Sequence, residues 1–140
     1  MKHQLTIHPE DSIEVFQKKF NHIYPYLKVE FFKKSHRKGQ GSHKKDMYAG
    51  SDLFKVLAKM NEKKTFFWND DMSIDAFEQG FRTKFGLNVQ VFRKSGNVWL
   101  VTSATDNWTL MQQNEEGQSL EMHLKAQSEN KEEFDRTEQE

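Results

Sequence analysis

The chain has 140 residues, no Cys, 21 basic and 21 acidic side chains, and an aromatic content dominated by 12 Phe. This length suits one domain or two small fused halves, and the lack of Cys excludes disulfides, thiolate metal sites and a Cys nucleophile. No stretch approaches the roughly 20 apolar residues of a membrane span, and no apolar run typical of a signal peptide follows the first residues. We therefore expect a cytoplasmic protein.

The neutral total conceals an uneven distribution of charge. Residues 1–60 hold 12 Lys/Arg and 6 Asp/Glu, a net of +6, and residues 61–114 hold 6 of each. Residues 115–140 hold 3 Lys/Arg and 9 Asp/Glu, a net of −6. A basic first half and an acidic end predict charged partners and say little about the fold.

A strand, a helix and a strand are predicted first. Residues 2–8 alternate apolar and polar side chains, which indicates a half-buried strand. Asp11 and Glu14 fit a capping box for the helix that follows, and Pro25 ends that helix. The helix has one apolar stripe at helical spacing, formed by Ile13, Phe16, Phe20, Ile23 and Tyr24. Residues 26–34 alternate again and form the second predicted strand.

The next segment is polar and then becomes helical. Residues 35–45, SHRKGQGSHKK, contain no apolar side chain and two Gly, which favours a long hairpin tip or loop. Residues 46–49 are expected to begin a return strand. Ser51 or Asp52 then caps a predicted helix over residues 53–60.

The second half follows the same order. Phe66 and Trp68 lie in a predicted strand, and the acidic residues Asp70 and Asp71 precede a helix, where negative charge is favourable. Its apolar stripe consists of Ile74, Phe77, Phe81 and Phe85, and Gly86 suits its C-terminal cap. Residues 87–93 and 98–102 are predicted strands, joined by a hairpin turn at residues 95–97.

The C-terminal part is less clearly patterned. Residues 108–113 are predicted to be helical, with a strand as the competing interpretation because NEEG at 114–117 is a good hairpin turn. Residues 118–125 alternate and predict a last strand. Residues 126–140 are mostly Glu, Gln, Lys and Ser, so we expect an acidic, disordered tail.

The two halves share an internal repeat. Ser12, Ile13, Phe16, Phe20 and Tyr24 match Ser73, Ile74, Phe77, Phe81 and Phe85 at an offset of 61. After one deletion, Leu27, Val29, Phe32, Lys33, Lys34 and Ser35 match Leu87, Val89, Phe92, Arg93, Lys94 and Ser95 at an offset of 60. Matches at one spacing with a single gap indicate a duplication.

The repeat predicts the architecture. We expect one α+β domain over residues 1–125, built from two β-α-β-β-α units at about 1–62 and 63–125. Pseudo-two-fold symmetry and helices covering a mostly antiparallel sheet would follow. A ferredoxin-like β-α-β-β-α-β core is the alternative.

Two surfaces are candidate binding sites. The first is a basic segment that could hold anions or nucleic acid, because Gly lets backbone N–H groups approach a phosphate. It consists of Lys33, Lys34, His36, Arg37, Lys38, His43, Lys44 and Lys45. The second is an outer strand face with aromatic side chains, typical of protein interfaces and of sheets that stack bases. It consists of Phe32, Phe67, Phe92 and Trp99. The plainer interpretations are a solvated hairpin tip and rings covered by packing.

No catalytic residues, metal ligands or cofactors are predicted. The His residues lack metal-site spacing, and the acidic cluster Asp70, Asp71, Asp75 and Glu78 fits helix capping better than a hard cation. We therefore expect a non-catalytic interaction module that binds another macromolecule through the sheet face or the basic loop. The expected partner is a protein, with a second copy of the chain as one candidate, and no membrane is expected. The alternatives are an RNA- or anion-binding domain using loop 33–45, and a small-ligand binder or enzyme with a pocket between the repeats.

Overall fold

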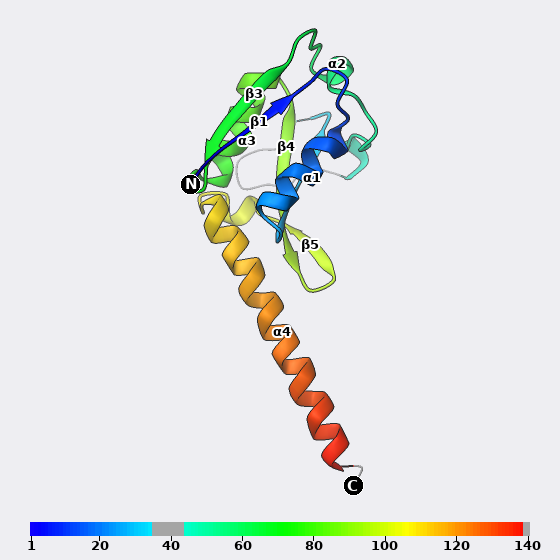
Figure 1. The fold of residues 1–140 in the computed structure, drawn as a ribbon, viewed down its shortest axis with the longest axis vertical. Helices are drawn as coiled ribbons and strands as arrows, with labels where there is room; N and C mark the ends of the chain where they lie inside the picture. Colours follow the sequence, from blue (N-terminus) through cyan, green and yellow to red (C-terminus); the bar gives the residue numbers. More distant parts are fainter. Residues whose placement is uncertain (35–43, 139–140) are drawn as a thin grey trace.

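The computed structural model describes the backbone of residues 1–34 and 44–138 and the side chains of residues 1–34 and 44–129. It is a mixed α+β fold with antiparallel sheets and four helices (Figure 1). The strands are β1 (Lys2–Ile7), β2 (Leu27–Phe32), β3 (Lys64–Asn69), β4 (Asn88–Ser95) and β5 (Val98–Val101). The helices are α1 (Ile13–Ile23), α2 (Phe54–Leu57), α3 (Ile74–Phe85) and α4 (Leu110–Glu138).

The described strands form two separate sheets. β1 pairs with β3, and β2, β4 and β5 pair in that order, all antiparallel. Leu5 lies opposite Phe66 in the first sheet, and Glu30 lies opposite Gln90 in the second. The helix α2 separates β2 from β3, so the element order differs from the β-α-β-β-α-β order of a ferredoxin-like core.

One aromatic core joins the sheets and the two main helices. The Phe16 ring of α1 lies 5.1 Å from the Phe81 ring of α3, and Phe81 also contacts Phe31 of β2 at 5.4 Å and Phe66 of β3 at 4.8 Å. The predicted stripes therefore face each other. Burial of this apolar area, at roughly 25 cal/mol per Å², is the main force holding the halves together.

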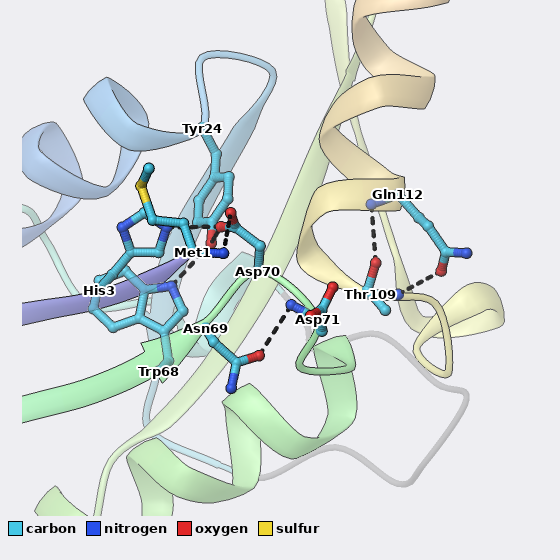
Figure 2. A network of polar contacts seen from close by, with 9 residues as sticks. All are labelled: Met1, His3, Tyr24, Trp68, Asn69, Asp70, Asp71, Thr109 and Gln112. Atoms are coloured by element: carbon cyan, nitrogen blue, oxygen red, sulfur yellow. Dashed lines mark hydrogen bonds and ion pairs between the residues drawn. The ribbon is translucent and has the colours of Figure 1, made fainter.

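Local chemistry sets the bounds of the helices. Ser73 caps α3, because its Oγ accepts a hydrogen bond from the Ala76 N–H at 3.1 Å, and Gly86 ends α3 with a φ of 68°. At the start of α4, the Thr109 N–H donates to Gln112 Oε1 and the Gln112 N–H donates to Thr109 Oγ1 (Figure 2). This reciprocal pair is a capping box. The helix predicted at residues 108–113 is thus confirmed, starting at Leu110.

The N-terminal third of α4 packs against the second sheet. Leu110, Gln113 and Gly117 are buried at helical spacing. A Cβ added at Gly117 would lie 2.7 Å from the Cβ of Tyr26. Only a residue without a side chain allows α4 to approach the start of β2 so closely.

Several sequence expectations for connecting and terminal segments were wrong. Residues 44–46 form a short 3-10 helix, and the expected return strand is reduced to one bridge between Phe32 and Met47. The helix expected over residues 53–60 is only Phe54–Leu57. The strand predicted at 118–125 is wrong, because α4 runs through it, and the helix continues to Glu138 where we expected a disordered tail. Within the described residues, no helix is long and apolar enough to span a membrane.

Candidate functional site

A shallow depression lies on the outer face of the β2–β4–β5 sheet. We call it the sheet-face groove. It has a volume of about 270 Å³ and is lined by Lys28, Glu30, Phe32, Lys44, Met47, Phe92 and Trp99. A neighbouring depression of about 290 Å³ shares Lys28, Glu30 and Trp99 and extends the surface to α1. The two together form one continuous strip of surface.

Strand alternation puts the groove side chains on one face. Leu27, Val29 and Phe31 of β2 point into the core, so the residues between them point outward. The register places Lys28 opposite Phe92, and Lys94 opposite Trp99. The groove therefore collects side chains from three adjacent strands.

Lys28 is held between two aromatic rings. Its Nζ lies 5.4 Å from the Phe92 ring centroid and 5.3 Å from the Trp99 centroid. It also lies 3.6 Å from Glu30 Oε1. Contacts of this kind are each worth about 0.5–1 kcal/mol at a partly exposed site, so the lysine and both rings are ordered together.

A hydrogen bond from helix α1 orients the Glu30 side chain. The Gln17 amide of α1 donates to Glu30 Oε2 at 2.9 Å and to the Val29 carbonyl at 2.8 Å. The Glu30 carboxylate therefore has a fixed position next to Lys28. The floor of the groove carries alternating charge with aromatic walls, which suits a ligand having both charged and apolar groups.

The structure brings part of the two predicted sites together. Phe32, Phe92 and Trp99 of the aromatic face all line the groove, and so does Lys44 of the basic segment. Phe32 is covered, with 2% of its surface exposed. Phe67 is 64% exposed but lies on β3 in the other sheet, where it lines a separate depression with Thr83 and Lys84.

The three other described lysines of the basic segment do not line the groove. Lys33, Lys34 and Lys45 are exposed, and the ammonium of Lys33 lies 5.8 Å from the Tyr48 ring. His36, Arg37, Lys38 and His43 lie outside the described residues. Among the described side chains, no group of three His, Cys, Asp or Glu is arranged to hold a metal ion.

A second polar cluster surrounds Asp70, a residue for which the sequence predicted only a role in helix capping. Figure 2 shows Tyr24, His3 and Trp68 gathered at the Asp70 carboxylate. Trp68 Nε1 donates to Tyr24 Oη at 3.0 Å, and Tyr24 Oη donates to Asp70 Oδ1 at 2.7 Å. His3 Nε2 lies 2.7 Å from the same Asp70 oxygen. The cluster ties α1, β1, β3 and the start of α3 together.

The Asp70 cluster shifts two pKa values. Burial, and then the hydrogen bond to Asp70, raise the pKa of Tyr24 far above its ordinary value. Burial acts to raise the pKa of the Asp70 carboxyl, but the hydrogen bonds from Tyr24, His3 and the Met1 amino group together hold it below its ordinary value. The tyrosine is thus kept neutral and the aspartate charged. None of the four depressions described on the surface is lined by these residues, so we assign the cluster to stability.

Comparisons of the chain with protein families, with curated proteins and with solved structures find no significant match.

Proposed function

We propose that this protein is a non-catalytic binding module and that the sheet-face groove binds a segment of another protein carrying acidic and apolar side chains. The observation that supports this most is the convergence of Lys28, Lys44, Phe92 and Trp99, from four separate segments, on one groove. Protein interfaces are enriched in aromatic side chains. Acidic groups of the partner would meet the two lysines, and its apolar groups would meet the rings.

Three features favour a protein partner over nucleic acid. Base stacking needs free ring faces, but Phe32 is buried and Lys28 occupies Phe92 and Trp99. The groove holds the Glu30 carboxylate beside two lysines, so it is not the uniformly basic surface that a phosphate backbone needs. RNA or anion binding through loop 33–45 stays a prediction, since most of that loop lies outside the described residues.

A ligand pocket between the two halves has less support. Rings from both halves fill the seam, with Phe16 at 5.1 Å from Phe81 and Phe20 at 5.4 Å from Phe77. The depressions described lie on the surface. These observations favour a binding surface on the sheet over a ligand pocket or active site between the halves.

We also propose that the fold arose by internal duplication. Backbone hydrogen bonds recur at constant offsets: Ile13 N donates to Asp52 O, and Ile74 N donates to Trp108 O. Phe54 N donates to Asp11 O, and Leu110 N donates to Met72 O. In the first pair, the donor of the second hydrogen bond lies 61 residues after that of the first, and the acceptor lies 56 residues after. In the second pair, the donor is displaced by 56 residues and the acceptor by 61. A pseudo-two-fold relation between the halves accounts for all of these pairs.

A cytoplasmic location is the remaining part of the proposal. Its support is the absence of Cys in 140 residues, which suits a reducing compartment.

NMR titration of the isotopically labelled full chain tests the binding function. The probes are a helical peptide of Glu and Leu, poly-L-glutamate, and oligo-uridylate. We expect the Glu/Leu peptide to shift the amide signals of Lys28 and Phe92 and the indole N–H signal of Trp99. The amide signals of Phe67 and of α3 should shift little, because these residues lie on other surfaces.

The probes distinguish the competing functions. Poly-L-glutamate should bind more weakly than the Glu/Leu peptide, because it supplies no apolar contact for the rings. Shifts with oligo-uridylate alone would replace the protein partner with nucleic acid. If no probe shifts the groove signals, the proposed function fails.

A further inference from the structure

The strand β3 has a free edge. Its antiparallel pairing with β1 occupies the other edge, and no described strand lies beyond it (Figure 1). The pairing is regular from Lys2 opposite Asn69 to Ile7 opposite Lys64, and β3 contains no Pro that would remove a backbone donor. A strand edge of this kind is a template for another extended chain unless the protein covers it.

The protein does cover the comparable edge of the second sheet. Along β2, the Tyr48 N–H donates to the Phe31 carbonyl and the Lys33 N–H donates to the Asp46 carbonyl, both at 2.8 Å. The segment before α2 therefore occupies the outer edge of β2. Among the described residues, β3 has no such covering segment.

The pairing register identifies the backbone groups that point to the free edge. The Asp70 N–H donates to the Met1 carbonyl at 3.0 Å, so these two residues form a hydrogen-bonded pair. Hydrogen-bonded and non-hydrogen-bonded pairs alternate along an antiparallel ladder, which puts Thr65 and Phe67 in non-hydrogen-bonded pairs. The 2.9 Å contact between the Thr6 and Thr65 hydroxyls fits the closer side chains of such a pair. The N–H and C=O groups of Thr65 and Phe67 therefore point away from β1.

A depression of about 480 Å³ lies along this edge. It is lined by Thr65, Phe66 and Phe67 of β3 and by Gly80, Thr83 and Lys84 of α3. Phe66 is buried and Phe67 is 64% exposed, because successive side chains of a strand point to opposite faces. A depression lined by both rings must therefore lie at the edge of the strand. None of its lining residues comes from β1, so the edge is the free one.

The lining indicates what the depression can accept. The hollow next to α3 exists because residue 80 is Gly: a Cβ added there would meet only the Phe66 ring, at 3.5 Å. The floor is therefore apolar. Lys84 is the one charged side chain among the described lining residues, so an acidic group is favoured in the ligand. Pairing of this edge with a second copy would instead bring two such cations together.

We infer that the free edge of β3 binds an extended segment of another protein by strand addition. The backbone of the segment would pair with Thr65 and Phe67, which provides affinity, and its alternating side chains would provide specificity. One set of apolar side chains enters the hollow between Phe66 and Gly80, and the other lies beside the exposed Phe67 ring. An acidic group of the segment meets Lys84. This surface belongs to the other sheet, so the inference goes beyond the sheet-face groove and does not depend on it.

NMR titration of the isotopically labelled full chain tests the inference with two peptides. The first is a short peptide of alternating Val and Thr with Glu at both ends. The second has the same side chains but N-methyl groups on its backbone nitrogens, which removes the donors that strand addition needs. The first peptide should shift the amide signals of Thr65, Phe67 and Gly80 and slow hydrogen exchange at Thr65 and Phe67. The methylated peptide should do neither.

Two pairs of variants locate the site. Thr65→Pro removes an N–H that points to the free edge, and Thr6→Pro makes the same change at the opposite residue, on the β1 edge. Gly80→Leu fills the hollow without altering the strand, and Gln79→Leu places the same side chain at an exposed neighbouring position that does not line it. Thr65→Pro and Gly80→Leu should each raise the Kd of the Val/Thr peptide at least about tenfold. Both controls should change it less than about twofold.

Several results would overturn the inference. These are the absence of shifts with the Val/Thr peptide, equal binding of the methylated peptide, and unchanged affinity in Gly80→Leu. The Gly80→Leu result decides the matter if circular dichroism shows that the Pro variants have lost their fold. A dimer of the unaltered chain that Thr65→Pro dissociates and Thr6→Pro does not would assign the edge to a second copy, which would contradict the proposed partner.

Discussion

Glu30 of β2 and Gln90 of β4 lie directly opposite each other, and each is hydrogen-bonded to the helix of its own half with donor and acceptor exchanged. Gln17 of α1 donates to Glu30 Oε2 at 2.9 Å, whereas Gln90 Nε2 donates to Glu78 Oε2 of α3 at 3.3 Å. The two pairs occupy matched positions in the proposed repeat. One is half-buried and borders the groove, and the other is fully buried.

This difference in burial predicts unequal effects of mutation. Gln90→Leu removes a donor to a buried carboxylate, so the free energy of unfolding should fall by about 1–3 kcal/mol. Gln17→Leu, at the half-buried pair, should lower it by less than about 1 kcal/mol, since water can solvate Glu30. Urea unfolding of both variants measures this, and a larger loss for Gln17→Leu would contradict it.

The Asp70 cluster predicts how stability depends on pH. The pKa of Asp70 is lowered by folding, so its contribution is present above the unfolded value of about 3.9 and is lost as pH falls further. The pKa of Tyr24 is raised by folding, so its contribution is present below the unfolded value of about 10 and is lost at higher pH. The melting temperature, measured from acidic to alkaline pH, should therefore fall at both ends of the range.

Tyr24→Phe tests the same cluster directly. It removes the hydroxyl that donates to Asp70 and accepts from Trp68. The free energy of unfolding at neutral pH should fall by about 1–3 kcal/mol, and the alkaline decline should become smaller. An unaltered alkaline limb in this variant would show that another group causes it.

Two glycines in helices should respond oppositely to Ala. A Cβ at Gly117 would lie 2.7 Å from Tyr26 Cβ, so Gly117→Ala must displace α4 and should destabilise the chain. At Gly80 of α3, the added Cβ would lie 3.5 Å from the Phe66 ring, an ordinary contact. Gly80→Ala should therefore stabilise by about 0.5–1 kcal/mol through helix propensity. Melting temperatures decide this, and a stabilising Gly117→Ala would be inconsistent with the packing of α4.

Trp99 should matter for binding more than for folding. Trp99→Ala removes one of the two rings around Lys28, which should lower the free energy of unfolding by about 1 kcal/mol or less. Affinity for the Glu/Leu peptide should fall at least about tenfold, because interface Trp residues typically contribute 2 kcal/mol or more. Phe67→Ala, on the other sheet, is the control and should leave that affinity unchanged. Calorimetric titration provides both affinities.

Much of the secondary structure could be predicted because its signals are local. Each of these signals determines the structure of only a few neighbouring residues. They are the apolar stripes of α1 and α3, Pro25, Gly86 and the turn at residues 95–97. The segment 118–125 was misassigned because Leu120, Met122 and Leu124 alternate like a strand, whereas Leu120 and Leu124 are also one helical turn apart. The sequence Thr109-x-x-Gln112 is a capping-box signal that favours the helix.

The groove could be predicted only in part, because pairing between distant strands determines it. The alternation of side chains along the strands predicts an outer face for Phe32, Phe92 and Trp99. Phe92 and Trp99 line the groove, whereas Phe32 is covered. Nothing local indicated that β3 would pair with β1 alone, which separates Phe67 from the other rings. The bridge between Phe32 and Met47 brings Lys44 to the groove, and that contact joins residues 15 positions apart.

The most direct test of the binding function compares two charge reversals in one assay. Fluorescence anisotropy gives the Kd of a labelled Glu/Leu peptide for the unaltered chain, for Lys28→Glu with Lys44→Glu, and for Lys63→Glu with Lys84→Glu. If the sheet-face groove is the binding site, the first variant weakens binding at least about tenfold and the second changes it less than about twofold. Equal losses in both variants, or none in the first, would contradict the account.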